Sequence, residues 1–427
     1  MKIHLKNGRV IDPASGLDAI QDIYIAAGRI QAMGTMPTDF HANQVIDASG
    51  LIVCPGLVDL SLRLREPGLE HIAGLESEMH AAAVGGVTSL ACPPDTHPPL
   101  DEPGLVEMLK FRARTMPGPR VYPVGALTRG LKGERLTEMA ELHEAGCIAF
   151  SQADAPLVDT QVLLRAMEYA ATFGFSVWLR PQDPHLSKNG VAHDGVVAAR
   201  LGLHPIPVPA ETVALATILL LARETGARVH LCRLSSRAGV EMVRQAKKDG
   251  LPITCDVNIH HVHLSEMDVA DFDPNCHLVP PLRSQRDRDA LRQALEEGVI
   301  DAICSDHAPV DEDAKELPFQ EAEPGATGVE LLLPLTLKWA TEAGLPLARA
   351  LAYITHRPAA IMGVNAGVIA AGGPADMCVF DPEAAWQVTP TNLASLGKNS
   401  PYLGLEMIGR VAYTIIDGHL DFKQRSA

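Results

Sequence analysis

The sequence predicts an α/β fold in which a (β/α)8 TIM barrel carries a small discontinuous β-sandwich domain. Eight short apolar runs alternate with amphipathic stretches through the middle of the chain, which is typical of such a barrel. Short strand-like segments separated by turns occur at both ends. The 427 residues are too many for one simple core. We therefore expect the sandwich domain at 1–51 and 366–427 and the barrel at 52–365.

The apolar runs give the predicted barrel strands their positions. They lie around residues 52–59, 87–92, 120–124, 147–151, 176–179, 228–232, 252–257 and 300–304. Most are followed by a stretch with helical periodicity, for example 106–114, 159–172, 211–225, 239–248 and 287–297. In a barrel of this type the functional residues follow the carboxyl ends of the strands. The ends of these runs are therefore the places to look for a site.

Composition excludes several classes of partner. The formal net charge of −16 argues against binding to nucleic acid or to an anionic membrane surface. No apolar run reaches the length needed to span a bilayer, and the N-terminus has the pattern of a strand and turn rather than a signal peptide. The eight cysteines are scattered without paired spacing. We expect free thiols in a reducing, cytoplasmic environment.

The end of the first strand carries the most informative motif. The segment Pro55–Gly68 resembles the first-strand signature of dihydroorotases, members of the amidohydrolase superfamily, in which two histidines separated by one residue bind zinc. Ser61 and Arg63 stand at these two histidine positions. Arg65 is kept, and the resemblance implies that it would hold a substrate carboxylate. The motif therefore keeps the residues around the two metal-binding positions, but it lacks the two histidines themselves.

The resemblance covers essentially the whole chain, and the other strand ends lack their ligands too. Gln152 stands where the resemblance implies an acidic metal bridge. Arg180 and Arg233 stand at histidine positions after the fifth and sixth strands. Of the six expected metal-site positions, only Asp306 after the eighth strand keeps the family's residue.

These replacements predict a site without metal. A hydrolytic zinc needs about three protein ligands and a water molecule. A guanidinium has no lone pair to offer and repels a divalent ion. We therefore expect no zinc or other cofactor, and no functional catalytic residue in the degenerate site formed by Ser61, Arg63, Gln152, Arg180, Arg233 and Asp306.

The resemblance also implies a substrate-like pocket. Asp95 stands in place of an asparagine, and a carboxylate there would repel an anionic pyrimidine. Val279 and Val310 replace an asparagine and a histidine, whereas a Pro-Gly pair that would line the substrate ring is kept. The pocket residues are Arg65, Asp95, Val279, Val310, Pro324 and Gly325.

Three arginines are expected to converge where a metal centre would lie, facing Asp306. Two guanidiniums about 4 Å apart repel by roughly 4 kcal/mol at an effective dielectric constant of 20. Further acids or a bound anion are therefore expected nearby. The arginines either fill the space and pair structurally, form an anion site, or swing out of the pocket. The candidate acids are Glu66, Asp95, Asp154 and Asp183.

Other polar segments have simpler interpretations. The segment 258–263 contains three histidines, and the resemblance implies that His260 and His261 belong to the scaffold. His307 is expected to point away from the pocket. The acidic run 311–316 is interpreted as a solvated loop at the barrel mouth rather than a calcium site.

Together the residues and the resemblance predict a catalytically inactive dihydroorotase homologue. In some bacteria such a chain is the obligate partner of the aspartate carbamoyltransferase catalytic chain, so the resemblance implies a structural subunit of a hetero-oligomer in pyrimidine biosynthesis. One alternative is an active dihydroorotase or related cyclic amidohydrolase whose ligands come from unexpected positions. Another is a sensor that binds a small anion among the arginines.

Overall fold

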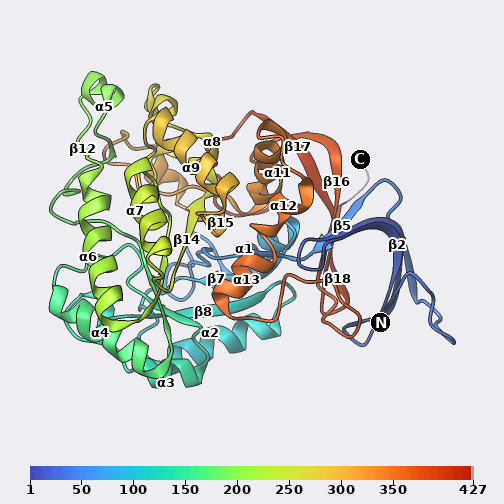
Figure 1. Ribbon diagram of the computed structural model, residues 1–427. Coiled ribbons are helices and arrows are strands. Elements are labelled where there is room, and N and C mark those ends of the chain that lie inside the picture. Colours follow the sequence, from blue (N-terminus) through green and yellow to red (C-terminus); the bar gives the residue numbers. More distant parts are fainter. Residues whose placement is uncertain (425–427) are drawn as a thin grey trace.

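The computed structural model describes residues 1–424 and shows a parallel barrel beside a mixed sheet (Figure 1). The barrel contains eight strands, as predicted. Neighbouring strands pair in chain order, and the parallel bridge between Leu62 and His307 lies at the seam between the first and last of them. The strands are β6 Leu57–Asp59, β7 Val87–Cys92, β8 Arg120–Ala126, β9 Ala149–Ser151, β10 Ser176–Leu179, β13 Arg228–Leu231, β14 Ile253–Asn258 and β15 Ala302–Cys304.

Helices surround the barrel, and α4 illustrates how the sequence determines them. Its buried residues recur at helical spacing, so that one face packs against the barrel. Asp159 caps the first turn by accepting a hydrogen bond from the Gln161 amide at 2.8 Å, and Gly174 ends the helix in a left-handed conformation. The helices are α1 Leu75–Val84, α2 Pro103–Thr115, α3 Met139–Ala145, α4 Thr160–Phe173, α6 Pro209–Thr225, α7 Arg237–Lys248, α9 Gln285–Glu297, α11 Leu332–Glu342, α12 Leu347–Ala352 and α13 His356–Met362.

The mixed sheet joins the two ends of the chain. Its main path runs β18-β17-β16-β5-β1-β2-β3, and β4 pairs with β1. The antiparallel pairing of β5 with β16 connects the N-terminal strands to the C-terminal ones. The strands are β1 Lys2–Asp12, β2 Leu17–Ala26, β3 Arg29–Met33, β4 Gln44–Asp47, β5 Ile52–Pro55, β16 Met377–Gln387, β17 Glu406–Ile416 and β18 His419–Lys423.

The structure divides the first predicted barrel strand, 52–59, into two. The β5 half pairs with β1 and β16 in the mixed sheet, and only β6 enters the barrel. The division lies at Gly56, where a Cβ atom would come within 2.1 Å of the Thr88 hydroxyl oxygen. Glycine lets the chain pass this close to β7 as it leaves one sheet for the other. A continuous apolar run conceals this division.

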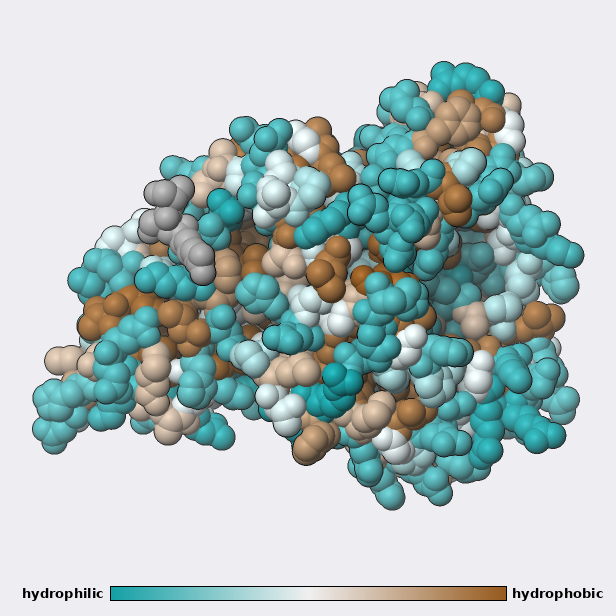
Figure 2. All heavy atoms as spheres, turned by 180° about the vertical axis from the view of Figure 1, so that it is seen from behind, coloured by the Kyte–Doolittle hydropathy of each residue, from teal (hydrophilic) through white to brown (hydrophobic). Residues whose placement is uncertain are grey.

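Shorter elements form a lobe above the carboxyl ends of the barrel strands, marked by α5 in Figure 1. The lobe has a core of its own that includes Val197, Leu203 and Phe319. The face in Figure 2 is mostly hydrophilic, with hydrophobic atoms in separate patches. The remaining elements are β11 Ala192–His193, α5 Val196–Leu201, β12 Pro205–Ile206, α8 Ile259–His263, α10 Glu312–Lys315 and the 3-10 turns η1 Arg129–Leu131, η2 Glu266–Val269, η3 Pro274–Cys276 and η4 Val329–Leu331.

The helices and the cysteines of the structure bear on two expectations from the sequence, namely the absence of a membrane span and the presence of free thiols. Throughout residues 1–424, every helix is too short or too polar to cross a lipid bilayer. All eight cysteines are free thiols, and all except Cys232 are buried.

A buried carboxylate fastens α1 to the end of β15. Glu78 lies 2.7 Å from His307 Nε2 and accepts hydrogen bonds from the Ser395 hydroxyl and the Leu396 amide at 2.7 and 3.1 Å. His307 Nδ1 accepts the Gly328 amide at 3.2 Å, so Nε2 carries the proton and donates to Glu78. His307 therefore points away from the barrel mouth, as predicted. This network links an outer helix, a barrel strand and the 395–396 segment.

Glu78→Gln is expected to lower the free energy of unfolding by about 3 kcal/mol, because an amide cannot replace a buried carboxylate that accepts several hydrogen bonds. Burial alone would raise the pKa of Glu78, but the bonds from His307 and Ser395 hold it below its usual 4.5. The stabilisation is therefore complete above that value and is lost as the pH falls through the lower folded pKa. Urea denaturation of the variant across pH measures this.

The exposed Glu76 on the same helix provides the matched control. Glu76→Gln is expected to change the unfolding free energy by less than about 0.5 kcal/mol. Equal losses for the two variants would contradict the assigned role of Glu78.

Candidate functional site

Three arginines and three aspartates meet at the carboxyl ends of the barrel strands. We call this set the ionic cluster. Its members come from six different strand ends, after β6, β7, β9, β10, β13 and β15. They are Arg63, Asp95, Asp154, Arg180, Arg233 and Asp306.

Arg63 reaches all three acids from the histidine position after β6. Its Nε lies 2.8 Å from Asp95, Nη2 lies 2.7 Å from Asp154, and Nη1 lies 3.1 Å from Asp306. The side chain is only 7% exposed. Burial would lower the pKa of Arg63, but the carboxylates outweigh it and raise that pKa. The guanidinium is therefore permanently charged and fully engaged.

Arg233, after β13, reaches two of these acids, Asp154 and Asp306. Its Nη2 lies 2.5 Å from Asp154, its Nη1 lies 2.9 Å from Asp306, and Nη1 also donates to the Val279 carbonyl at 3.2 Å. The carboxylates overcome burial and raise the pKa of Arg233 well above its usual value. Arg233 and Asp306 both have left-handed backbones, with φ of 56° and 46°, and such strain is concentrated at sites whose surroundings fix the geometry.

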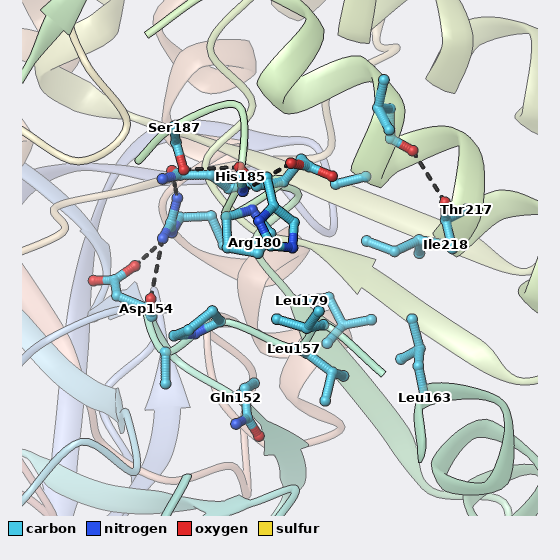
Figure 3. A pocket seen from close by; sticks show the side chains of 18 of the residues that line it. Gln152, Asp154, Leu157, Leu163, Leu179, Arg180, His185, Ser187, Thr217 and Ile218 are labelled. Atoms are coloured by element: carbon cyan, nitrogen blue, oxygen red, sulfur yellow. Dashed lines mark hydrogen bonds and ion pairs between the residues drawn. The ribbon is translucent and has the colours of Figure 1, made fainter. Parts of the chain in front are cut away.

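Arg180 is held by Asp154 at the edge of the cluster. Its Nε lies 2.5 Å from Asp154 Oδ1, its Nη2 donates to the Asp154 carbonyl at 3.3 Å, and its Nη1 contacts Gln182. Burial and the charge of Arg233 lower the pKa of Arg180. Figure 3 shows this pair beside a cavity of about 290 Å³ between the loops after β9 and β10.

The cluster is electrically balanced, with three guanidiniums against three carboxylates. The expectation of further acids is confirmed for Asp95 and Asp154. It is wrong for two other candidates, because Asp183 caps the turn at His185 and Glu66 accepts the Leu75 amide beside Arg112. Balance within the cluster removes the electrostatic need for a bound anion.

Asp154 is the centre of this arrangement, since all three arginines contact it. Burial would raise the pKa of Asp154, but Arg233, Arg180 and Arg63 lower it far below the usual value of a carboxyl group. Asp154 therefore stays ionised throughout the physiological pH range.

The remaining positions of the degenerate site behave differently from one another. Ser61 donates to Asp306 at 3.2 Å and so joins the cluster. Gln152 turns away, because its amide oxygen accepts from Thr128 at 2.9 Å and its nitrogen donates to the Leu131 carbonyl at 2.8 Å. Asn258, which the sequence analysis treated only as part of a histidine segment, donates to Asp306 at 3.0 Å. Its position at the carboxyl end of β14, where functional residues of a barrel lie, could have identified it as a site residue.

A cavity of about 200 Å³ remains above the cluster. The resemblance placed six residues around it, and five of them line it: Arg65, Asp95, Val279, Pro324 and Gly325. Val310 is buried and packs behind Gly325 instead. Arg65 donates to the Pro309 carbonyl at 2.8 Å and lies 3.8 Å from Glu323. Burial, with the charge of Arg63, lowers the pKa of Arg65.

Two of the three histidines after β14 are hydrogen-bonded to the scaffold, whereas both ring nitrogens of His260 are buried without a hydrogen-bond partner among residues 1–424. His261 Nε2 lies 3.1 Å from the Pro280 carbonyl, and His263 Nε2 lies 2.9 Å from the Leu335 carbonyl. Burial lowers the pKa of His260 to about 3 and that of His261 to about 4, so both rings are neutral.

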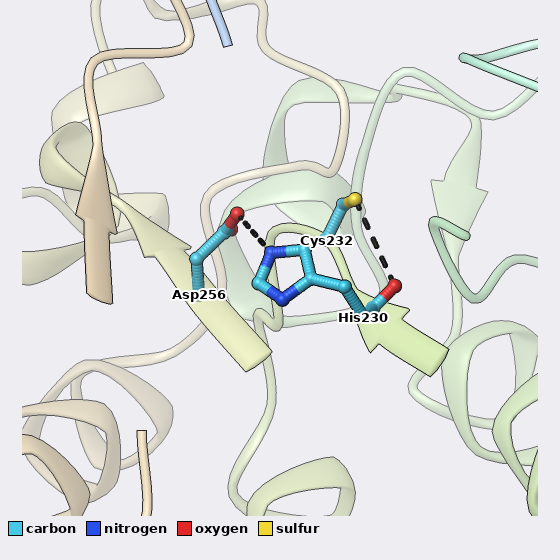
Figure 4. Close-up of side chains that lie close together, drawn as sticks. All are labelled: His230, Cys232 and Asp256. Atoms are coloured by element: carbon cyan, nitrogen blue, oxygen red, sulfur yellow. Dashed lines mark hydrogen bonds and ion pairs between the residues drawn. The ribbon is translucent and has the colours of Figure 1, made fainter. Parts of the chain in front are cut away.

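A group that the sequence analysis did not consider consists of His230, Cys232 and Asp256 (Figure 4). Their ligand atoms lie within 4.8 Å of one another. Both ring nitrogens of His230 are engaged, at 2.9 Å from Asp256 and 2.8 Å from the Thr254 hydroxyl. Burial raises the pKa of the Cys232 thiol well above 9, whereas metal binding needs a thiolate. The geometry favours a structural His–Asp pair.

Comparison with family models and curated proteins gives a consistent result. Residues 50–239 match the dihydro-orotase-like family model, and residues 180–420 match the amidohydrolase family model. A dihydroorotase-like protein of Pseudomonas aeruginosa is 46% identical over 98% of this chain and 99% of the relative. A dihydroorotase-like protein of Pseudomonas putida is 44% identical over the same shares. A dihydroorotase of Geotalea daltonii is 40% identical over 99% of this chain and all of the relative.

Solved structures share the whole fold. The L-hydantoinase (dihydropyrimidinase) from Arthrobacter aurescens superimposes with a TM-score of 0.86 and 26% identity, over 98% of this chain and 95% of the other. A D-hydantoinase superimposes with a TM-score of 0.84 and 23% identity, over 99% of this chain and 96% of the other, and this likeness shows the fold alone.

Asp154→Asn is expected to lower the free energy of unfolding by about 2 kcal/mol, because the cluster would then carry an uncompensated positive charge. The loss is smaller than for a fully buried acid, since the Asp154 side chain is 35% exposed. With its folded pKa depressed, Asp154 contributes fully above the unfolded value of 3.8 and less only as the pH falls further. The deficit of the variant should therefore be constant from neutral pH down to roughly that value.

Denaturation of Asp249→Asn supplies the control. This variant breaks the exposed pair of Asp249 with Arg223 and is expected to cost less than about 1 kcal/mol. An Asp154→Asn protein as stable as this control would show that the cluster tolerates a net positive charge.

Proposed function

The chain belongs to the dihydroorotase-like family of amidohydrolases, and we propose that it is a catalytically inactive member that serves as a structural subunit for the aspartate carbamoyltransferase catalytic chain in pyrimidine biosynthesis. The observation that carries the first half of this proposal is the neutral ionic cluster. Arginines extend from strand ends where the family places metal-binding histidines.

The residues present do not fit a hydrolytic zinc. Three of the family's ligand positions are guanidiniums here, and every carboxylate in the cluster lies within ion-pair distance of at least one of them. A divalent cation would have to displace these contacts and then lie among three positive charges. Without metal activation the pKa of water stays far above neutral pH, so hydroxide is not available as a nucleophile. Asp154 is also a poor general base, because its lowered pKa makes its affinity for a proton very small.

The structural role is supported by what has been kept. The chain retains the full barrel and mixed sheet, and it matches its relatives over nearly their whole length. A complete fold around a disabled site suggests that the outer surface is the functional part. The resemblance supplies the partner, the aspartate carbamoyltransferase catalytic chain, in a hetero-oligomer.

Two other functions have less support from the residues of the site. An active dihydroorotase or related cyclic amidohydrolase is favoured by the names of several relatives. However, every carboxylate of the ionic cluster is already paired with an arginine. A sensor for a small anion would need uncompensated positive charge, whereas the three cluster arginines are balanced.

The purified protein is expected to hold no stoichiometric zinc and to show no hydrolysis of dihydroorotate, because the cluster supplies neither ligands nor an activated water molecule. Elemental analysis and a turnover assay measure this. The double variant Ser61→His, Arg63→His is the sharper form of the test. It should stay inactive, since Arg180 and Arg233 still occupy two ligand positions. Turnover by either protein would mean that unidentified residues hold a metal.

The chain is expected to co-purify with aspartate carbamoyltransferase and to be needed for full transferase activity. Co-expression with a tagged transferase, followed by mass measurement and a carbamoyl-transfer assay, tests this. The control replaces the three cluster arginines with glutamine and the three aspartates with asparagine, which leaves the net charge unchanged. This variant should still support the transferase if it folds. A transferase that assembles and works fully without the chain would refute the structural role.

A further inference from the structure

A cavity of about 500 Å³ lies between two helices of the barrel and the C-terminal strands of the mixed sheet. Residues of α1 and α11 line one side of it, and residues of β16, β17 and β18 line the other (Figure 1). Its described lining residues belong neither to the ionic cluster nor to the cavity above that cluster. The volume is in the range of pockets that hold small molecules, so this cavity is a second place to look for a ligand.

Part of the cavity lining is apolar and rigid. Leu393 and Val411 are only 5% and 6% exposed, and the buried Pro334 of α11 lines the same cavity. Trp386 of β16 also lines it, and the indole Nε1 donates to the Gly409 carbonyl at 3.1 Å. This hydrogen bond fixes the orientation of the ring. A ligand with a flat apolar body would therefore meet a preformed surface.

Three basic side chains line the same cavity, those of His80, Arg410 and Lys423. The Arg410 guanidinium lies 5.5 Å from the centre of the Trp386 ring. Within residues 1–424 this is the only interaction of the Arg410 side chain, and the Lys423 side chain has none there. Two cationic groups at the cavity are thus left without a carboxylate partner.

The neighbouring acids do not neutralise these cations. Asp381 lies opposite Arg410 in the ladder of β16 and β17, but its carboxylate accepts two backbone amides of the following turn at 2.9 and 3.2 Å. Glu330 lines the cavity, and its oxygens accept two backbone amides at 2.7 and 3.1 Å. Burial raises the pKa of both Glu330 and Asp421, so neither acid has an ion pair strong enough to offset its desolvation.

We propose that this cavity binds a small organic anion, in which a carboxylate or phosphate group pairs with Arg410 and Lys423 and a planar apolar body packs against Trp386. Either head group suits a guanidinium, whose forked donors bind two oxygens at once. The ligand would contact both the barrel helices and the strands of the mixed sheet. Binding to the folded chain alone should therefore stabilise the fold by mass action. The proposal does not rest on the transferase partnership.

Titration of the purified full chain with phenyl phosphate and with benzoate tests the proposal. Fluorescence is a suitable signal, because Trp386 is the only one of the three tryptophans that is not buried. Saturable binding of at least one probe with a dissociation constant below about 1 mM is expected, and the tighter probe identifies the preferred head group. The same probe should raise the Tm. Inorganic phosphate and benzyl alcohol, which supply the head or the body alone, should bind at least about 10-fold more weakly.

Variants assign the binding to this cavity. Arg410→Gln should raise the dissociation constant of the bound probe at least about 10-fold, and Lys423→Met at least about 3-fold, because each removes a charged donor. Lys423 is exposed near the end of the chain, so its variant keeps the test valid if Arg410→Gln is unstable. Arg200→Gln is the matched control, since Arg200 is exposed on α5 and does not line the cavity. It should bind the probe as the unmodified chain does.

Three outcomes would overturn the proposal. Neither probe might show saturable binding, which would leave the cavity without a ligand of this class. Inorganic phosphate or benzyl alcohol could bind as tightly as the better probe, which would contradict a site for both head and body. An unchanged dissociation constant in Arg410→Gln and Lys423→Met would place the binding elsewhere on the chain.

Discussion

Neutrality of the ionic cluster is the constraint on which the barrel mouth depends. Three guanidiniums at the ends of buried strands would each cost several kcal/mol if left unpaired. Asp154 is shared among all three, and Asp95 and Asp306 complete the balance. Because the members come from six strands, the cluster ties together ends that would otherwise be joined only through neighbouring ladders. A seventh strand joins through Asn258 on Asp306.

This arrangement explains how the fold persists with a changed site. In a metal-containing barrel, ligands from several strands hold the strand ends together by coordinating the metal. In this protein, ion pairs between strand ends hold them together instead. Such pairs hold their geometry through directional hydrogen bonds, and they engage every carboxylate of the cluster. The same positions therefore serve the architecture of the barrel mouth. Fold likeness to hydantoinases is fully compatible with this, because function lies in the site rather than in the fold.

The sequence predicted the barrel, the helices and the meeting of the arginines, because these follow from hydrophobic period and from the rule that strand ends converge. It did not predict that Gln152 turns away or that Val310 packs behind Gly325, since side-chain direction depends on local partners such as Thr128 and Leu131. It ranked four acids equally, whereas only two reach the arginines. The division at Gly56 was hidden within one apolar run, and the His230–Asp256 pair required knowledge of strand register.

The pairing of β5 with β16 has a consequence for the order in which this protein can be completed. Cys54 lies opposite Cys378 in that ladder, so the partners are roughly 300 residues apart and emerge from the ribosome at very different times. The early strands β1–β3 can pair among themselves, but β5 keeps an open edge until β16 is synthesised. A product that stops before β16 would expose that edge and part of the core around Ile3, Ile23 and Val53. Synthesis of β16, rather than closure of the barrel, is then the event that covers this edge.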